Sequence, residues 1–206
     1  MLIYIIKKLF PNKFINYLRE KKIILNWYLK NKPTSPPHSI KQKTIKKYAK
    51  KYNIKTFIET GTYKGEMIEA TKNIFKKIYS IELDNDLWTK AIEKFKDDKY
   101  IKILNGDSGE ILPKLLKKIN NPCIFWLDGH YSGGITARGE LNTPIFKELE
   151  AVLNHKIKNH VILIDNARCF TGGNDYPTIK DLKSFIIDKN SKLKINIKND
   201  IIRITY

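Results

Sequence analysis

The sequence predicts an α/β protein whose doubly wound, mostly parallel sheet of seven strands ends in an antiparallel hairpin. Between residues 55 and 188, short apolar runs alternate five times with segments of helical spacing. That alternation is typical of parallel strands joined by helices on both faces of a sheet. The last two apolar runs, KLKINI and IIRITY, flank the turn residues Lys198-Asn199-Asp200, which is the pattern of a hairpin at a sheet edge.

The first 39 residues are predicted to form a basic helical arm and a linker, outside a main domain of residues 40–206. Apolar residues recur at helical spacing on either side of Pro11: Leu2, Ile6 and Leu9, then Phe14, Leu18 and Leu25. NKPTSPPHS, residues 31–39, has the composition of a linker. A short helix over residues 40–52 is expected to lead into the domain.

Each of the five repeating units in the domain is predicted to be a strand followed by a helix. Apolar runs bounded by polar or turn residues indicate the strands, and apolar residues at intervals of three and four indicate the helices. The expected strands cover residues 55–59, 77–83, 100–106, 123–128 and 160–165, and the expected helices cover 66–75, 86–95, 109–118, 143–153 and 179–188.

The expected location is the cytoplasm. No apolar run reaches the roughly 20 residues that span a bilayer, and the apolar start MLIYII precedes Lys7 and Lys8 instead of following them, unlike a secretory signal. The two cysteines, Cys123 and Cys169, lack metal-binding or redox spacing. We therefore expect two free thiols in a reducing compartment.

The positive charge is concentrated in the first quarter of the chain. The net charge is +18, and residues 1–55 contain 14 Lys and Arg19 against one acid, Glu20. An anionic partner is therefore expected for this quarter. Two interpretations stay open: the arm docks on the domain, which we favour slightly, or residues 1–32 contact the inner face of a membrane peripherally. A homodimer is a further expectation.

Polar residues follow the first three predicted strands, where ligands bind in a doubly wound sheet. Glycines in ETGTYKG permit a tight turn and a close approach of backbone to ligand. Glu82 is placed to accept from ribose hydroxyls, and a polar cluster follows the third strand. The residues of this end are Glu59, Gly61, Thr62, Tyr63, Gly65, Glu82, Asp107 and Ser108.

These motifs resemble the Rossmann-like class I S-adenosylmethionine-dependent methyltransferases. ETGTYKG, the acid in SIELD, NGDSGEILPKL and the closing hairpin match that family's order across residues 55–206, in a variant with Tyr63 in place of the middle glycine. A nicotinamide-binding domain is the competing interpretation, but GxGxxG is absent. The resemblance implies these cofactor contacts: Glu59 and Gly61 with the methionine part, Glu82 with the ribose, and Asp107 or Ser108 with the adenine.

The fourth and fifth predicted strands end in Asp128 and in Asp165-Asn166. Neighbouring parallel strands lie about 4.8 Å apart, so the two carboxylates are expected to face each other and to repel unless a cation or a proton joins them. Two carboxylates and an amide oxygen suit Mg²⁺, with Mn²⁺ or Ca²⁺ as alternatives. The structural alternative is that Asp128 caps a turn and that Asp165 pairs with Arg168 or caps a loop.

LDGH and LIDNA are similar to the metal-dependent O-methyltransferases of the catechol and caffeoyl-coenzyme A type, and LDG also resembles the macrocin type. The resemblance implies metal ligation by Asp128, Asp165 and Asn166. The catechol type has a lysine base three residues after its first Asp, where this chain has Tyr131. His130 is therefore our candidate base, because an ordinary imidazole pKa near 6.5 suits proton removal at neutral pH; the alternative is a histidine that fixes the loop.

Two long glycine-containing loops follow the fourth and fifth predicted strands. Their polar residues suit hydrogen bonding to a polyol, and loops this long are often functional. The expected substrate contacts are Tyr131, Arg138, Arg168 and Tyr176.

The function predicted from these patterns is methyl transfer from S-adenosylmethionine to a hydroxyl, with Mg²⁺, on a sugar, a glycan or another vicinal diol. In this hypothesis Asp128 and His130 are the catalytic residues. One alternative is methylation of nucleic acid, which is disfavoured because the chain lacks the pattern of an RNA-binding module. A second alternative is a non-catalytic scaffold that only binds the cofactor.

Overall fold

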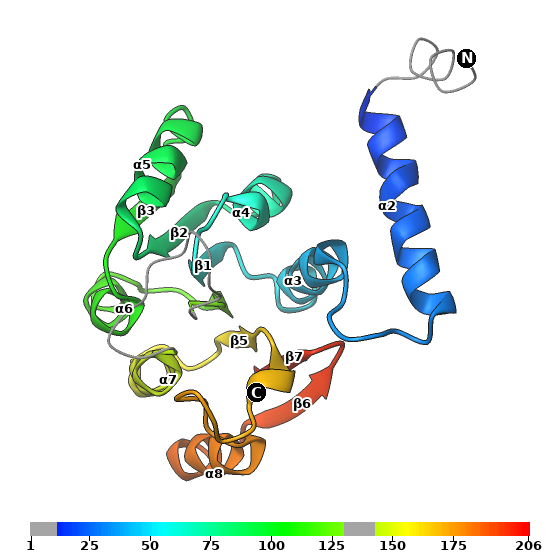
Figure 1. The fold of residues 1–206 in the computed structure, drawn as a ribbon. Coiled ribbons are helices and arrows are strands. Elements are labelled where there is room, and N and C mark those ends of the chain that lie inside the picture. Colours follow the sequence, from blue (N-terminus) through cyan, green and yellow to red (C-terminus); the bar gives the residue numbers. More distant parts are fainter. Residues whose placement is uncertain (1–11, 130–142) are drawn as a thin grey trace, which may run out of the picture.

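Seven strands form one sheet in the order β3-β2-β1-β4-β5-β7-β6, with helices against both of its faces (Figure 1). The structure is a computed structural model, and it describes residues 12–129 and 143–206. The strands are β1 Thr56–Thr60, β2 Lys77–Glu82, β3 Ile101–Asn105, β4 Cys123–Leu127, β5 Val161–Ile164, β6 Lys194–Lys198 and β7 Ile201–Thr205. The helices are α2 Asn12–Leu29, α3 His38–Tyr52, α4 Glu66–Thr71, α5 Asn85–Lys94, α6 Ser108–Leu116, α7 Ile145–Asn154 and α8 Ile179–Lys189, with short 3₁₀ turns η1 Lys72–Ile74 and η2 Ala167–Cys169.

The strand pairing confirms the predicted fold class. Strands β1 to β5 are parallel to one another, and β7 is antiparallel to both β5 and β6. The chain winds outward from β1 through β2 to β3, and then returns to β4 on the other side of β1. The strand order therefore reverses between β1 and β4, and ligands bind at such a point in this architecture.

Helix boundaries differ from the predicted ones where a cap or a turn decides them. Helix α3 begins at His38, two residues early, because Pro37 takes the N-cap position and a proline is compatible with a helix start. The helix predicted over residues 66–75 ends at Thr71 and tightens into η1. Helix α6 begins directly after Asp107, whose side chain accepts from the Gly109 N–H.

Alternate residues of the central strands supply two apolar clusters, one on each face of the sheet. On one face Ile58 and Phe125 belong to a cluster that α6, α7 and α8 cover. On the other face Phe57 and Trp126 belong to a cluster that includes Ile45 of α3. These five side chains are 0–2% exposed. The core thus fixes the central strands rigidly, and with them the side chains at their ends.

Helix α2 extends away from the sheet (Figure 1). Near its C-terminal end Trp27 is buried and donates from Nε1 to the Pro33 carbonyl at 2.8 Å, and Glu20 pairs with Lys43 of α3 at 3.3 Å. Most other side chains of α2 are exposed, so docking on the domain is limited to one side of the helix. None of the helices in the described part of the chain is long and apolar enough to cross a membrane.

Candidate active site

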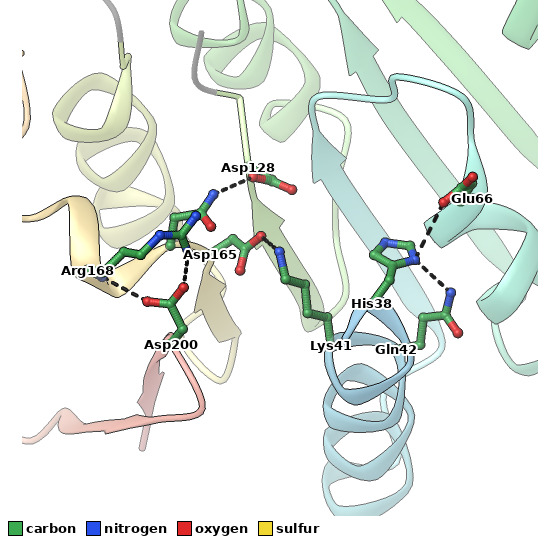
Figure 2. A network of polar contacts seen from close by, with 9 residues as sticks. His38, Lys41, Gln42, Glu66, Asp128, Asp165, Arg168 and Asp200 are labelled. Atoms are coloured by element: carbon green, nitrogen blue, oxygen red, sulfur yellow. Dashed lines mark hydrogen bonds and ion pairs between the residues drawn. The ribbon is translucent and has the colours of Figure 1, made fainter. Parts of the chain in front are cut away.

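The acidic residues that follow the central strands gather at one edge of the sheet. Thr60 pairs with Leu127, and Leu127 pairs with Ile164 on the next strand. Asp128 and Asp165 come one residue after two of these paired positions, so their backbones lie side by side. Figure 2 shows both carboxylates at this edge, together with side chains from α3.

The loop after β1 brings the two halves of the site into contact at Gly61. Gly61 has φ +83°, and its N–H donates to the Ile81 carbonyl at 2.9 Å. A β-carbon added to Gly61 would lie 2.7 Å from the Asp128 carbonyl oxygen, which is a steric overlap. Only glycine therefore lets the β1 loop pass this close to the end of β4.

Glu59 is a buried carboxylate on β1. Its Oε1 accepts from Ser80 Oγ at 2.7 Å, and Ser80 Oγ lies 2.6 Å from Thr62 Oγ1. The pKa of Glu59 is raised to about 8, mainly by burial and in addition by the negative charges of Asp128 and Glu82, against the lowering effect of the Ser80 hydrogen bond. A cationic group bound beside Glu59 would favour its ionised form.

Glu82, at the end of β2, holds the β1 loop in place. Its carboxylate accepts from the Tyr63 N–H at 2.7 Å and from the Asp84 N–H at 3.0 Å. Tyr63 itself has φ +49°, and Gly65 ends the loop in the left-handed region with φ +67°. Each carboxylate oxygen has a second lone pair, which leaves acceptor capacity for ribose hydroxyls.

The polar residues after β3 lie beside a buried acid from α7. Asp107 caps α6, and Ser108 is buried. The carboxyl of Glu148 interacts with the hydroxyls of Ser108 and Thr60. Its pKa is raised to about 7, mainly by burial and against the lowering effect of those two hydrogen bonds. Its Oε1 is buried and has no hydrogen-bond partner within the described residues. The predicted adenine side of the site therefore contains an acid whose pKa lies near pH 7.

Asp165 pairs with Lys41 of α3 (Figure 2). The side chain of Asp165 is 1% exposed and that of Lys41 is 13% exposed. The pKa of Asp165 is raised to about 7, mainly by burial and in addition by the charge of Asp128, against the lowering effect of Lys41. The alternative pairing of Asp165 with Arg168 is therefore wrong, because α3 lies close enough to place a lysine there instead.

The residues predicted to bind a metal fit a hard divalent cation. Asp165 Oδ1 is buried and has no hydrogen-bond partner in the described part of the chain, while Lys41 takes only Oδ2. Asn166 Nδ2 lies 3.5 Å from Asp128 Oδ1, and a half turn of that amide would present an oxygen. Within residues 12–129 and 143–206, no group of three or more His, Cys, Asp or Glu side chains is arranged to hold a metal ion, so the third protein ligand would be the Asn166 amide.

The predicted substrate contacts differ in their surroundings. Arg168 pairs with Asp200, from the β6–β7 turn, through both its backbone N–H at 2.8 Å and its guanidinium (Figure 2). Tyr176 packs edge-on against Phe170, and burial raises the pKa of its hydroxyl. His130, Tyr131 and Arg138 lie outside the described residues.

Lys41 and Glu148 were not predicted from the sequence as site residues. Lys41 is one of 14 lysines in the first 55 residues, and nothing in that local pattern distinguishes it. Glu148 left a signal, since it shares the buried face of α7 with Ile145, Leu149 and Val152. An acid on an apolar helix face indicates a buried polar interaction.

No protein-family model and no curated protein sequence matches the chain, whereas solved structures do. The methyltransferase PaMTH1 of Podospora anserina, bound to S-adenosylhomocysteine, superposes with a TM-score of 0.58 at 14% identity, over 96% of this chain and 97% of that one. The chain has the class I methyltransferase fold. The O-methyltransferase TomG of Streptomyces achromogenes, in complex with S-adenosylmethionine, shares this methyltransferase fold with a TM-score of 0.60 at 14% identity, over 89% and 86% of the two chains. An O-methyltransferase of Bacillus cereus, in complex with S-adenosylhomocysteine, has a TM-score of 0.59 at 12% identity, over 90% of each chain.

Proposed function

We propose that the chain transfers the methyl group of S-adenosylmethionine to a hydroxyl oxygen. The observation that carries this proposal is that two groups of residues meet at Gly61: the acids of β1 and β2 with the glycines of the β1 loop, and the carboxylates after β4 and β5. A methyl donor at the first group and an acceptor at the second would be adjacent. Solved proteins of the same fold that bind S-adenosylmethionine or S-adenosylhomocysteine support the choice of cofactor.

The proposed cofactor contacts follow from charge and hydrogen-bonding capacity. Glu59 would accept from the ammonium of the methionine part, since a nearby cation favours its ionised form. Glu82 would accept from the ribose hydroxyls, and Ser108 and Asp107 would border the adenine. Thr62 and the loop glycines would hold the backbone in place around the cofactor.

The proposed acceptor is a sugar, a glycan or another vicinal diol. Asp128, Asp165 and Asn166 would hold a divalent cation, for which Mg²⁺ is the first choice because all three offer oxygen ligands. When bound, the cation supplies Lewis-acid polarisation of the acceptor hydroxyl. His130 remains the proposed base, and Tyr131, Arg138, Arg168 and Tyr176 remain the proposed acceptor contacts.

Calorimetry with S-adenosylmethionine tests the cofactor assignment. We expect binding by the full chain and at least a roughly tenfold loss of affinity in Glu82→Gln, because a ribose hydrogen bond to a charged acceptor is lost. Lys90→Gln, an exposed change on α5, is the matched control. Absence of binding at millimolar cofactor would overturn the enzyme proposal.

A transfer assay then separates the acceptor classes. Labelled S-adenosylmethionine is offered with Mg²⁺ to catechol, to sugar nucleotides, to a lipid-linked saccharide and to RNA. Label in a sugar acceptor supports the proposal, whereas label in RNA alone supports the nucleic-acid alternative. Cofactor binding without transfer to any of them would favour the non-catalytic scaffold.

A further inference from the structure

Two contacts among the described side chains of α2 lie on one side of the helix. Trp27 is 6% exposed on that side, and Glu20, seven residues earlier, pairs with Lys43 of α3. Residues seven apart lie on the same side of an α-helix. The two contacts therefore define the domain-facing side of α2.

The opposite side of α2 carries an apolar stripe formed by Leu18, Leu25 and Leu29. The intervals of seven and four residues keep the three leucines on one side, and Trp27 is two positions from both Leu25 and Leu29, which turns it to the other. The leucines are 49%, 58% and 75% exposed, and Tyr17 and Tyr28 beside them are also exposed. Soluble surfaces seldom present three aligned leucines to water.

Basic side chains flank this leucine stripe. Glu20 is the only acid of α2, and it is already paired with Lys43. The exposed basic residues of α2 and of the residues after it are Arg19, Lys21, Lys22, Lys30 and Lys32. Leucines with tyrosines on one side and lysines around them are typical of helices that lie in the interface of an anionic membrane.

We propose that α2 lies on an anionic lipid surface and inserts the leucine stripe among the acyl chains. The charge favours lipid over a second copy of the chain. A second copy would set the basic residues of two α2 helices against one another, with no free acid on either helix to pair with them, whereas anionic headgroups are complementary to them.

This proposal is independent of the methyl-transfer proposal, although the two surfaces are neighbours in the chain. The linker after α2 ends at Pro37, α3 then begins at His38, and Lys41 in its first turn contacts the Asp165 carboxylate (Figure 2). Docking of α2 on a membrane would hold the carboxyl ends of the central strands near the lipid headgroups.

Vesicle sedimentation of the full chain tests the proposal. The vesicles are pure phosphatidylcholine, or phosphatidylcholine with roughly one third phosphatidylglycerol, a content that gives a strongly negative surface. The variant Leu18→Ser/Leu25→Ser/Leu29→Ser removes the stripe at exposed positions, so the fold is retained. The matched control is Ile92→Ser/Ile187→Ser/Ile197→Ser, which replaces three exposed apolar residues outside α2.

We expect the wild-type chain to bind the anionic vesicles, to bind neutral vesicles at least roughly tenfold more weakly, and to lose binding as salt rises. The leucine variant should bind anionic vesicles at least roughly tenfold more weakly than wild type, and the isoleucine control should bind like wild type. Equal binding by the leucine variant would overturn the proposal. So would light scattering that shows a wild-type dimer and a monomeric leucine variant without vesicle binding, because α2 would then be a dimer interface.

Discussion

The Lys41 ammonium contacts the Asp165 carboxylate although 124 residues separate them in the chain. Helix α3 lies outside the five strand-helix units, yet it supplies the cation that neutralises this buried acid. Helix α3 is therefore part of the candidate site, although it precedes the repeating strand-helix units of the fold.

Replacing Lys41 with Met should destabilise the chain more at high pH than at low pH, in the absence of divalent cations. The folded pKa of Asp165 is about 7, above its unfolded value near 3.9, so the folded state binds more protons between these values and stability falls as pH rises through them. Without Lys41 the folded pKa rises further, and the loss continues above pH 7. We expect a cost of about 3 kcal/mol at pH 8 and under about 1 kcal/mol at pH 5 by urea denaturation. Lys43→Met, at an exposed pair, is the control; equal costs of Lys41→Met at both pH values would contradict the prediction.

The affinity for S-adenosylmethionine should rise with pH up to about 8. The free site holds Glu59 with a pKa of about 8, and binding of the cofactor ammonium favours the ionised form, so binding releases a proton below that pH. Calorimetry at pH 6, 7 and 8 in buffers of different ionisation enthalpy measures the number of protons released on binding. Glu59→Gln should bind at least roughly tenfold more weakly and without proton release at this site; an unchanged proton count in this variant would refute the assignment.

The metal prediction concerns Asp128 and Asp165. Asp165→Asn and Asp128→Asn should each lower Mg²⁺-dependent methyl transfer by roughly a hundredfold or more, while the cofactor affinity changes by less than about threefold, because these carboxylates belong to the acceptor half of the site. Asp188→Asn, an exposed change on α8, controls for loss of one negative charge. Full activity of wild type in excess chelator would remove the cation from the mechanism.

Gly61→Ala should disrupt the candidate site through a steric overlap between the β1 loop and the end of β4. The added β-carbon would overlap the Asp128 carbonyl oxygen, and φ +83° is strained for alanine. We expect a loss of about 2 kcal/mol in the free energy of unfolding together with a loss of cofactor binding. Gly173→Ala is the matched control, since the nearest atom to its added β-carbon is 3.9 Å away. Equal stability of the two variants would show that the β1 loop can move away from β4.

The buried histidine pair should make the chain sensitive to acid. His155 Nδ1 lies 2.9 Å from His160 Nε2, and His160 Nδ1 accepts from the Cys123 N–H. Burial lowers the pKa of His160 to about 4, below its unfolded value, so the unfolded state binds more protons in this range. Stability should fall by about 3 kcal/mol as pH drops from 6.5 to 4. Urea denaturation of His160→Asn, whose amide can still accept, should show a smaller fall. Lys102→Gln, an exposed change on β3, is the control, and an identical fall in His160→Asn would contradict this origin.

The sequence predicted the sheet and the acids at its edge because local patterns determine both. An apolar run that ends in an acid, as in CIFWLD, places the acid at a strand end whatever the rest of the chain does. Glu59, Glu82, Asp128 and Asp165 were found in this way. The two thiols were also predicted to be free, as they are.

Pairs between side chains of different helices, strands and turns could not be predicted from local patterns. The pairing of Arg168 with Asp200 was not predicted, because the β6–β7 turn brings Asp200 close to η2 only in the folded chain. Lys41 reaches Asp165 only because α3 packs on the sheet through Ile45 and Ala49. Such pairs depend on how whole elements pack against one another, and the periodicity of one segment does not determine that packing.

Asp128 contributes to the raised pKa of Glu59, Glu148 and Asp165 alike. The charge of Asp128 thus acts on three buried acids at the carboxyl ends of the strands. In the proposed function, this negative charge would distinguish a sulfonium from a thioether. The proposed methyl donor carries a positive charge on sulfur, and the demethylated product does not, so the attraction between Asp128 and the sulfur would end once the methyl group has left. The acids buried beneath the site would thereby favour exchange of spent cofactor for fresh cofactor.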